Sequence, residues 1–209
     1  MRRCRSSSNS GTRPWLAAGA ALILCGLLAG CLLQTRPDEG PPGGNPNDQA
    51  KWAQPVALGI ALGNIKRALE AQQRNLTNYG NSFSDTGFEL IIDPADESEL
   101  GGNPFTEWSA TLEEQRMTGI LSSVSAKITL TWTPRDSIDY SSSVRYYQDL
   151  VYRLKFEEST RSVTYSGKAD VWFTDDGQGQ YFITKWVDKR DGSPNRTWGW
   201  LRARNQLEF

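Results

Sequence analysis

From Ser125 onward, apolar and polar residues alternate along the chain with a period of two. Because successive side chains of a β-strand point to opposite faces of a sheet, such alternation predicts strands with one buried face. The alternation is clear in three segments. Two later segments continue it less regularly, with apolar and polar residues on both faces. These five predicted strands are 125–133, 150–157, 163–173, 181–189 and 198–204. One-sided alternation with short connections is typical of an antiparallel sheet whose second face is open to solvent.

The connections and one glycine refine this prediction. Asp176-Gly177 lies between the third and fourth segments and is a strong hairpin signal. Gly167 in the middle of the third segment predicts a bend or bulge. Because long strands usually twist and curve, we expect the sheet to have a concave face that a helix can cover.

Helical periodicity precedes the strands. Apolar residues recur at helical spacing from Leu58 to Leu76, charged residues lie between them, and Gly80 is the expected stop. A second helix is predicted around residues 108–119, after the chain breaks at Asp93-Pro94 and Gly101-Gly102. The predicted fold class is therefore α+β: N-terminal amphipathic helices packed on a long, curved antiparallel sheet of about five strands, with a cone-like shape.

The N-terminal thirty residues have the layout of an export signal. They contain four arginines and no acid, followed by an apolar stretch from Trp15 to Gly30. The stretch ends in Leu28-Ala29-Gly30-Cys31, which resembles the lipobox of bacterial lipoproteins. The resemblance implies that a diacylglycerol is attached to Cys31 and that residues 1–30 are removed. The following Leu32 favours the outer membrane in proteobacterial members of that class.

An uncleaved anchor is the alternative. Residues 15–33 carry no charge and number 19, which is close to the length that spans a bilayer. Both interpretations place the rest of the chain in the cell envelope, facing the periplasm or the cell surface. Cys4 and Cys25 lie in the predicted signal, so the lipoprotein interpretation leaves Cys31 as the one cysteine of the mature chain and excludes a disulfide within it.

The segment after the cysteine is rich in proline and glycine. Residues 32–50 show no apolar periodicity, so burial cannot offset the entropy of ordering them, and we expect a flexible tether. The predicted organisation is a signal peptide at 1–30, a lipidated linker at 31–50 and a single α+β domain at 51–209. Beyond the four N-terminal arginines, the chain has 19 of its 23 basic residues and all 24 acidic ones, a formal charge of −5. This charge argues against a nucleic-acid partner.

The order of these elements resembles the nuclear transport factor 2-like superfamily, a cone-shaped α+β fold. The local match is Tyr165-Ser166-Gly167-Lys168-Ala169, the strand Gly179-Gln180-Tyr181-Phe182-Ile183-Thr184-Lys185-Trp186-Val187-Asp188, and Trp198-Gly199. The order of elements covers residues 55–205, and the motifs cover about a quarter of that span. A lipocalin-like barrel is the alternative, but five strands are too few to close an eight-stranded barrel.

Few residues offer catalytic chemistry. The chain has no histidine, which excludes histidine-based triads and the commonest ligand of transition metals. Asp170 and Asp188 are the best carboxylate candidates because both lie on predicted strands, and the simpler interpretation is surface acids or acids paired with Arg153 or Lys168. Asp93, Asp96, Glu97 and Glu99 form an acidic cluster that suggests calcium, but its spacing is not that of an EF-hand and a solvated loop is the preferred interpretation. We predict no catalytic residue, metal site or cofactor.

Aromatic residues are the last candidate site. Large aromatic side chains most often fill the core, which is the preferred interpretation, but on a concave sheet they would also suit a pocket for an apolar ligand. Trp198 and Trp200, on one face of the last predicted strand, would instead suit a partner surface. The residues predicted for a pocket or partner surface are Trp132, Tyr152, Tyr165, Trp186, Trp198 and Trp200.

These observations predict a lipid-anchored envelope protein whose domain binds a small ligand or an envelope protein without catalysis. An enzyme with an acidic residue inside the cone is the first alternative, and a structural accessory of an envelope complex is the second. A cavity lined by aromatic residues and one buried carboxylate would favour the enzyme.

Overall fold

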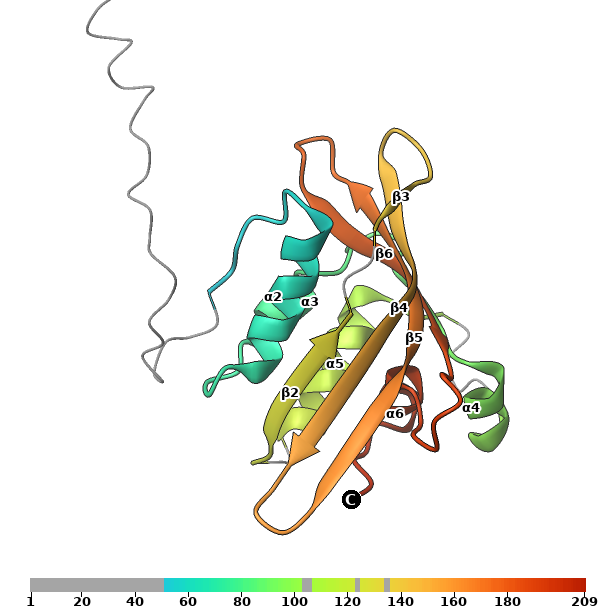
Figure 1. Ribbon diagram of the computed structural model, residues 1–209. Helices are drawn as coiled ribbons and strands as arrows, with labels where there is room; N and C mark the ends of the chain where they lie inside the picture. The colour runs from blue at the N-terminus through green and yellow to red at the C-terminus, as the bar shows by residue number, and fades with distance from the viewer. Residues whose placement is uncertain (1–50, 103–106, 123–124, 134–135) are drawn as a thin grey trace, which may run out of the picture. The chain divides into compact units, whose positions relative to one another are not determined.

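The computed structural model describes residues 51–102, 107–122, 125–133 and 136–209 (Figure 1). The predicted signal peptide, Cys31, the tether and the alternative anchor at residues 15–33 lie outside the described residues. Among the helices that are described, none has the length and apolar character needed to cross a membrane.

Six strands of the described residues form one sheet. They are β1 (Glu89–Ile91), β2 (Lys127–Trp132), β3 (Ile138–Asp139), β4 (Val144–Glu157), β5 (Ser162–Asp175) and β6 (Tyr181–Lys189). The order is β1-β6-β5-β4-β2, with β3 also paired to β4, and every pair is antiparallel except β1 with β6. The first four predicted strands are confirmed as β2, β4, β5 and β6. The two shortest strands, β1 and β3, are too short to show a period and were not predicted.

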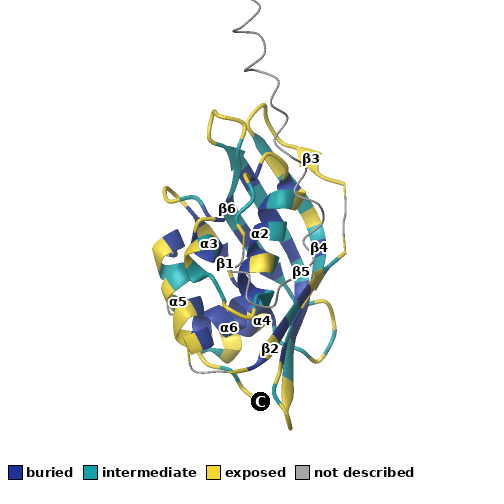
Figure 2. Ribbon diagram, turned by 90° about the vertical axis from the view of Figure 1, so that its left-hand side faces the viewer, coloured by how far each residue is buried: buried dark blue, intermediate teal, exposed yellow. Residues whose placement is uncertain are grey.

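Helices cover the inner face of this sheet (Figures 1 and 2). They are α2 (Leu58–Glu70), α3 (Leu76–Gly80), α4 (Pro94–Glu99), α5 (Ala110–Ser122) and α6 (Trp198–Arg204). The predicted first helix is confirmed but divided, since Ala71 leaves the helical conformation and Asn75 caps a new helix by accepting from Asn78 N. The second predicted helix is α5. The predicted α+β fold class is therefore confirmed, with a mixed rather than purely antiparallel sheet.

Helix α2 also closes the free edge of the sheet. Its apolar stripe is buried, and its polar side reaches the edge strand β2: Glu70 Oε1 accepts from Leu130 N at 2.6 Å. Arg74, just after α2, donates to the carbonyl oxygen of Ala126. An edge strand with unpaired backbone groups invites pairing with another chain, and these side chains satisfy two of those groups.

The predicted strand at 198–204 is wrong, because this segment forms helix α6. Thr197 caps the helix by accepting from Trp200 N, and Asn205 ends it in the left-handed conformation at φ 57°. Residues 198–203 are all buried, so the helix has no polar face along which a 3.6-residue period could be recognised. The alternation of tryptophan and arginine therefore imitated a strand.

Gly167 marks a close approach rather than the predicted bulge. The register shifts occur elsewhere, between Tyr147 and Leu150 and between Trp172 and Phe173. A Cβ on Gly167 would lie 2.6 Å from the carbonyl oxygen of Lys189 and 3.0 Å from Tyr152 Oη. Only glycine fits between these two groups.

Gly167→Ala is therefore expected to lower the free energy of unfolding by about 1–3 kcal/mol, because the new methyl group overlaps backbone that is fixed in the sheet. Chemical denaturation monitored by circular dichroism would measure this loss. Gly59→Ala in α2 is the matched control, since nothing lies within 4 Å of its Cβ position, and it should leave stability unchanged or slightly higher. Equal stability of the two variants would contradict the crowding at Gly167.

Candidate functional site

The inside of the cone holds a buried carboxyl group, Asp188, on β6. Its side chain is 1% exposed. Tyr152 Oη donates to Asp188 Oδ1 at 2.7 Å, and Gly199 N of α6 donates to Oδ2 at 2.5 Å. Trp198 N in turn donates to Tyr152 Oη at 2.8 Å. Desolvation by burial raises the pKa of Asp188 to about 6, against the opposing effects of Arg202 and these hydrogen bonds.

A buried ion pair lies beside it. Arg202 of α6 and Glu113 of α5 are both 0% exposed, and Arg202 Nε lies 2.9 Å from Glu113 Oε1. Glu113 also accepts from Tyr79 Oη and, at 2.9 Å, from Trp108 Nε1. Desolvation and the neighbouring Glu113 charge raise the pKa of Tyr79 well above its usual value. Glu113 therefore has a counter-charge and two hydrogen-bond donors, whereas Trp186 Nε1, Trp198 Nε1 and Arg202 Nη1 and Nη2 are buried without a hydrogen-bond partner among the described residues.

Aromatic rings fill the remaining space. The Arg202 guanidinium carbon lies 4.2 Å from the ring centre of Trp198 and 4.9 Å from that of Trp186. Trp186 and Trp198 meet edge to face with their centres 5.5 Å apart. These contacts leave the rings packed as core.

The six aromatic residues predicted as a pocket or partner surface are thus brought together mainly in the core. Tyr152, Tyr165, Trp186, Trp198 and Trp200 are buried, and Trp132 is half-buried against the same core. Trp198 and Trp200 are 0% and 3% exposed, so neither presents a broad exposed face, although Trp200 lines a groove at the surface. Their placement on a helix rather than on a sheet face is the reason.

The acidic cluster is part of a folded element. Asp93 caps α4 by accepting from Ala95 N, and Asp96 is 0% exposed. Asp96 pairs with Arg190 and accepts from Thr197 N at 3.1 Å, so it joins α4 to the start of α6. The prediction of a solvated loop is wrong for Asp96. No three acidic, cysteine or histidine side chains within the described ranges are arranged to hold a metal ion.

The other predicted carboxylate, Asp170, lies on the outer face of the sheet. It pairs with Lys189 at 2.7 Å, rather than with Arg153 or Lys168, and accepts from Asp149 N. It does not meet Asp188. The two carboxylates therefore do not form a pair for acid–base chemistry.

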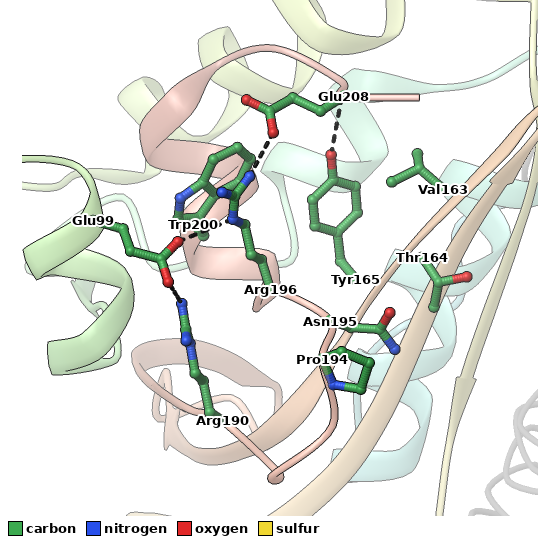
Figure 3. A pocket seen from close by; sticks show the side chains of 10 residues that line it. All are labelled: Glu99, Val163, Thr164, Tyr165, Arg190, Pro194, Asn195, Arg196, Trp200 and Glu208. Carbon is green, nitrogen blue, oxygen red and sulfur yellow. Dashed lines mark hydrogen bonds and ion pairs between the residues drawn. The ribbon is translucent and has the colours of Figure 1, made fainter.

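An open groove of about 370 Å³ lies outside the core, next to α4 and α6 (Figure 3). We call it the Arg196 groove. Its lining residues are Glu99, Val163, Thr164, Tyr165, Arg190, Pro194, Asn195, Arg196, Trp200 and Glu208.

Charged side chains dominate this groove. Glu99 bridges Arg190 and Arg196, with the nearest atoms 2.5 Å and 3.1 Å apart, and Arg196 also pairs with Glu208. The hydrogen bond from Arg190 lowers the pKa of Glu99. The guanidinium of Arg196 lies 4.2 Å from the Trp200 ring centre, which orients it across the groove. Sequence reasoning missed these arginines because their partner Glu99 lies more than ninety positions away.

No protein-family model and no curated protein sequence matches the chain. Among solved structures, it is similar to a protein assigned as the beta subunit of an aromatic-ring-hydroxylating dioxygenase from Novosphingobium aromaticivorans DSM 12444. The TM-score is 0.51 and the identity 13%, over 69% of this chain and 94% of that one. A protein assigned as an aromatic ring hydroxylase from Novosphingobium aromaticivorans DSM gives a TM-score of 0.50 and 10% identity, over 67% and 90%. An NTF-2-like protein of unknown function from Shewanella oneidensis MR-1 gives 0.43 and 12%, over 63% and 94%.

These likenesses concern the fold. The helices on a curved sheet of residues 51–209 share their α+β fold with the two Novosphingobium structures, and this is the helix-on-curved-sheet arrangement that the order of elements predicted. The identities are too low to carry over any chemistry.

Proposed function

We propose that the protein is a lipid-anchored, non-catalytic domain of the bacterial cell envelope that binds a small ligand or an envelope partner in the Arg196 groove. The observation that carries this proposal is the filled cone. Trp186, Trp198 and Arg202 are each 0% exposed and contact one another. A substrate inside the cone would have to displace these side chains, whereas the groove is open.

The chemistry of the groove supports a polar ligand. Arg190 and Arg196 present guanidinium groups to one side, and Thr164 and Asn195 add neutral polar groups. Arginine forks bind carboxylates with two parallel hydrogen bonds, and here they already hold Glu99 and Glu208. A ligand or partner segment that carries carboxylates would take the place of these intramolecular partners.

Asp188 is the observation that favours the enzyme as a second candidate. Its pKa of about 6 suits a general base, and Tyr152 is bonded to it. However, both of its oxygens already accept hydrogen bonds, from Tyr152 and Gly199, and α6 lies over it. An enzyme using Asp188 would therefore require α6 to move away.

The lipid anchor is supported by Leu28-Ala29-Gly30-Cys31 after a basic and then apolar N-terminus. Cells that produce the wild-type protein are expected to incorporate labelled palmitate into it, and Cys31→Ala should lose the label. Cys25→Ala is the matched control, because it changes a cysteine within the predicted signal and should keep the label. Incorporation that survives Cys31→Ala would contradict the anchor at this residue.

The binding site is tested by affinity capture from detergent-solubilised membranes, with bound proteins and small molecules identified by mass spectrometry. Arg196→Ala is expected to reduce recovery of the bound molecule at least tenfold, because it removes the charge at the centre of the groove. Arg153→Ala is the control, since Arg153 is exposed on the opposite face of β4 from the core. Equal recovery with both variants would contradict a site in the groove.

A further inference from the structure

Apolar and aromatic side chains are exposed at the end of the domain where the described chain begins. Tyr140 is 73% exposed, Val56 56% and Ile138 41%. Tyr146 and Trp172 lie next to Tyr140 and Ile138, half-buried on the outer face of the sheet. We call Ile138, Tyr140, Tyr146 and Trp172 the tether-end surface.

Contacts join the start of the described chain to β6 and to β3 at this end of the domain. Tyr181 N donates to the carbonyl oxygen of Pro55 at 2.8 Å, which fixes the segment before α2 to β6. The Arg145 guanidinium lies 5.8 Å from the Tyr181 ring centre, and Arg145 pairs with Asp139 of β3 at 2.8 Å. Figure 1 shows residues 51–57, the β5–β6 turn and β3 at the same end of the domain.

The aromatic rings of this surface are held in place. Tyr146 and Trp172 stack with their centres 5.2 Å apart and their planes 9° apart, and Tyr140 meets Tyr146 edge to face. Tyrosine and tryptophan have an apolar body and a polar tip, so they are enriched where a membrane meets water. A rigid, exposed group of such rings with Ile138 beside it suits this interface better than bulk water.

The charges here do not favour an anionic partner or a strongly cationic one. Arg145 is paired with Asp139 at 2.8 Å, and Lys185 with Glu89 at 2.8 Å. Asp175 and Asp176 use their side-chain oxygens to accept from the N–H groups of the β5–β6 turn. Burial of apolar area, rather than attraction to charged headgroups, would therefore stabilise contact with a lipid surface.

The position of the tether makes the bilayer the nearest such surface. Nineteen residues lie between Cys31 and Lys51, and a flexible tether of that length, which their composition predicts, would span roughly 25 Å. A lipid at Cys31 would hold this end of the domain near the membrane at a high effective concentration, so weak contacts suffice.

From this arrangement we infer that the tether-end surface docks on the phospholipid bilayer that carries the anchor. The inference rests on the proposed lipid anchor. It gives the domain a fixed orientation: the opposite end, with the β4–β5 turn, points away from the membrane, since β4 alone is about 40 Å long.

Site-directed spin labelling of the full, lipidated protein in its own membranes tests this orientation. The predicted mature chain has no free thiol, so Ser142→Cys places a single nitroxide beside Tyr140. Ser159→Cys in the exposed β4–β5 turn is the matched control at the other end. We expect collisions with oxygen, which enters the bilayer, to exceed those with a water-soluble nickel chelate at position 142, and the reverse order at position 159.

Two further measurements separate the outcomes. Ile138→Ser combined with Tyr140→Ser should give the label at position 142 the same accessibility as the label at position 159, with an unchanged melting temperature. Palmitate incorporation is followed in the same samples: its absence would contradict the anchor, whereas a lipidated protein with a water-exposed label at 142 would contradict docking alone. Strong dipolar broadening at 142 would show that a second copy covers the surface instead, and would also overturn the inference.

Discussion

Replacing Arg202 with methionine is expected to lower the free energy of unfolding by about 3–5 kcal/mol. Arg202 and Glu113 are both 0% exposed and form an ion pair of 2.9 Å. Without the guanidinium, Glu113 keeps hydrogen bonds from Tyr79 and Trp108 but loses its counter-charge in the core. Because methionine fills much of the same space, the loss of stability would come from the unpaired charge of Glu113 rather than from a cavity.

Urea denaturation of the wild type and three variants measures this effect. Arg204→Met is the matched control on the same helix, because Arg204 is 53% exposed and lies 3.7 Å from Glu208, and its loss should stay below about 1 kcal/mol. The double variant Arg202→Met with Glu113→Gln should recover at least half of the lost stability, because glutamine leaves no unpaired charge in the core. Loss of Arg202 leaves no other acceptor unpaired, since Nη1 and Nη2 have no hydrogen-bond partner among the described residues. A double variant as unstable as Arg202→Met alone would show that packing, not charge, sets the cost.

The long strands could be predicted from the sequence because each buries one face. In β4, Leu150, Tyr152, Leu154 and Phe156 are buried and the residues between them are not, so the period of two survives in the residue types. Helix α2 was predicted for the same reason, because its buried apolar residues recur with the helical period of 3.6 residues. In α6 the core surrounds the helix, so no polar face remains and no period exists for the sequence to show.

The candidate site could be predicted only in part. Asp188 was a candidate because it lies on a strand that the sequence reveals, but its burial depends on Tyr152 and Gly199, which other elements contribute. Glu113 lies in a predicted helix and Arg202 in the segment wrongly predicted as a strand; the two are far apart in sequence, and each looks like an ordinary surface charge. A pairing across such a distance leaves no local pattern, and only the packing of α5 against α6 brings the two charges together.

Arg190 and Arg196 show the same limit on the surface. Both lie in the segment that connects β6 to α6, which has neither helical nor strand periodicity. Their role depends on α4, which presents Asp96 and Glu99 to them. The groove therefore becomes visible only once the acidic cluster is known to be a helix that packs near α6.

The stability of the protein is expected to fall between about pH 4 and pH 7 through the titration of Asp188. Its pKa in the folded protein is about 6, against 3.8 as the ordinary value of an aspartate, so the folded state holds the proton more tightly than the unfolded chain. Protonated Asp188 therefore stabilises the folded protein relative to ionised Asp188 by about 3 kcal/mol. This stabilisation is fully present below pH 3.8 and is lost as the pH rises through about 6.

Asp188→Asn keeps the shape of the neutral side chain beside Tyr152, Gly199 and Arg202 but cannot ionise. The difference in unfolding free energy between wild type and variant should therefore change by about 3 kcal/mol between pH 4 and pH 7. Asp85→Asn, at an exposed position, should follow the wild-type profile. Parallel profiles for the wild type and Asp188→Asn, measured by urea denaturation at each pH, would show that Asp188 is ionised in the core throughout and that Arg202 outweighs its burial.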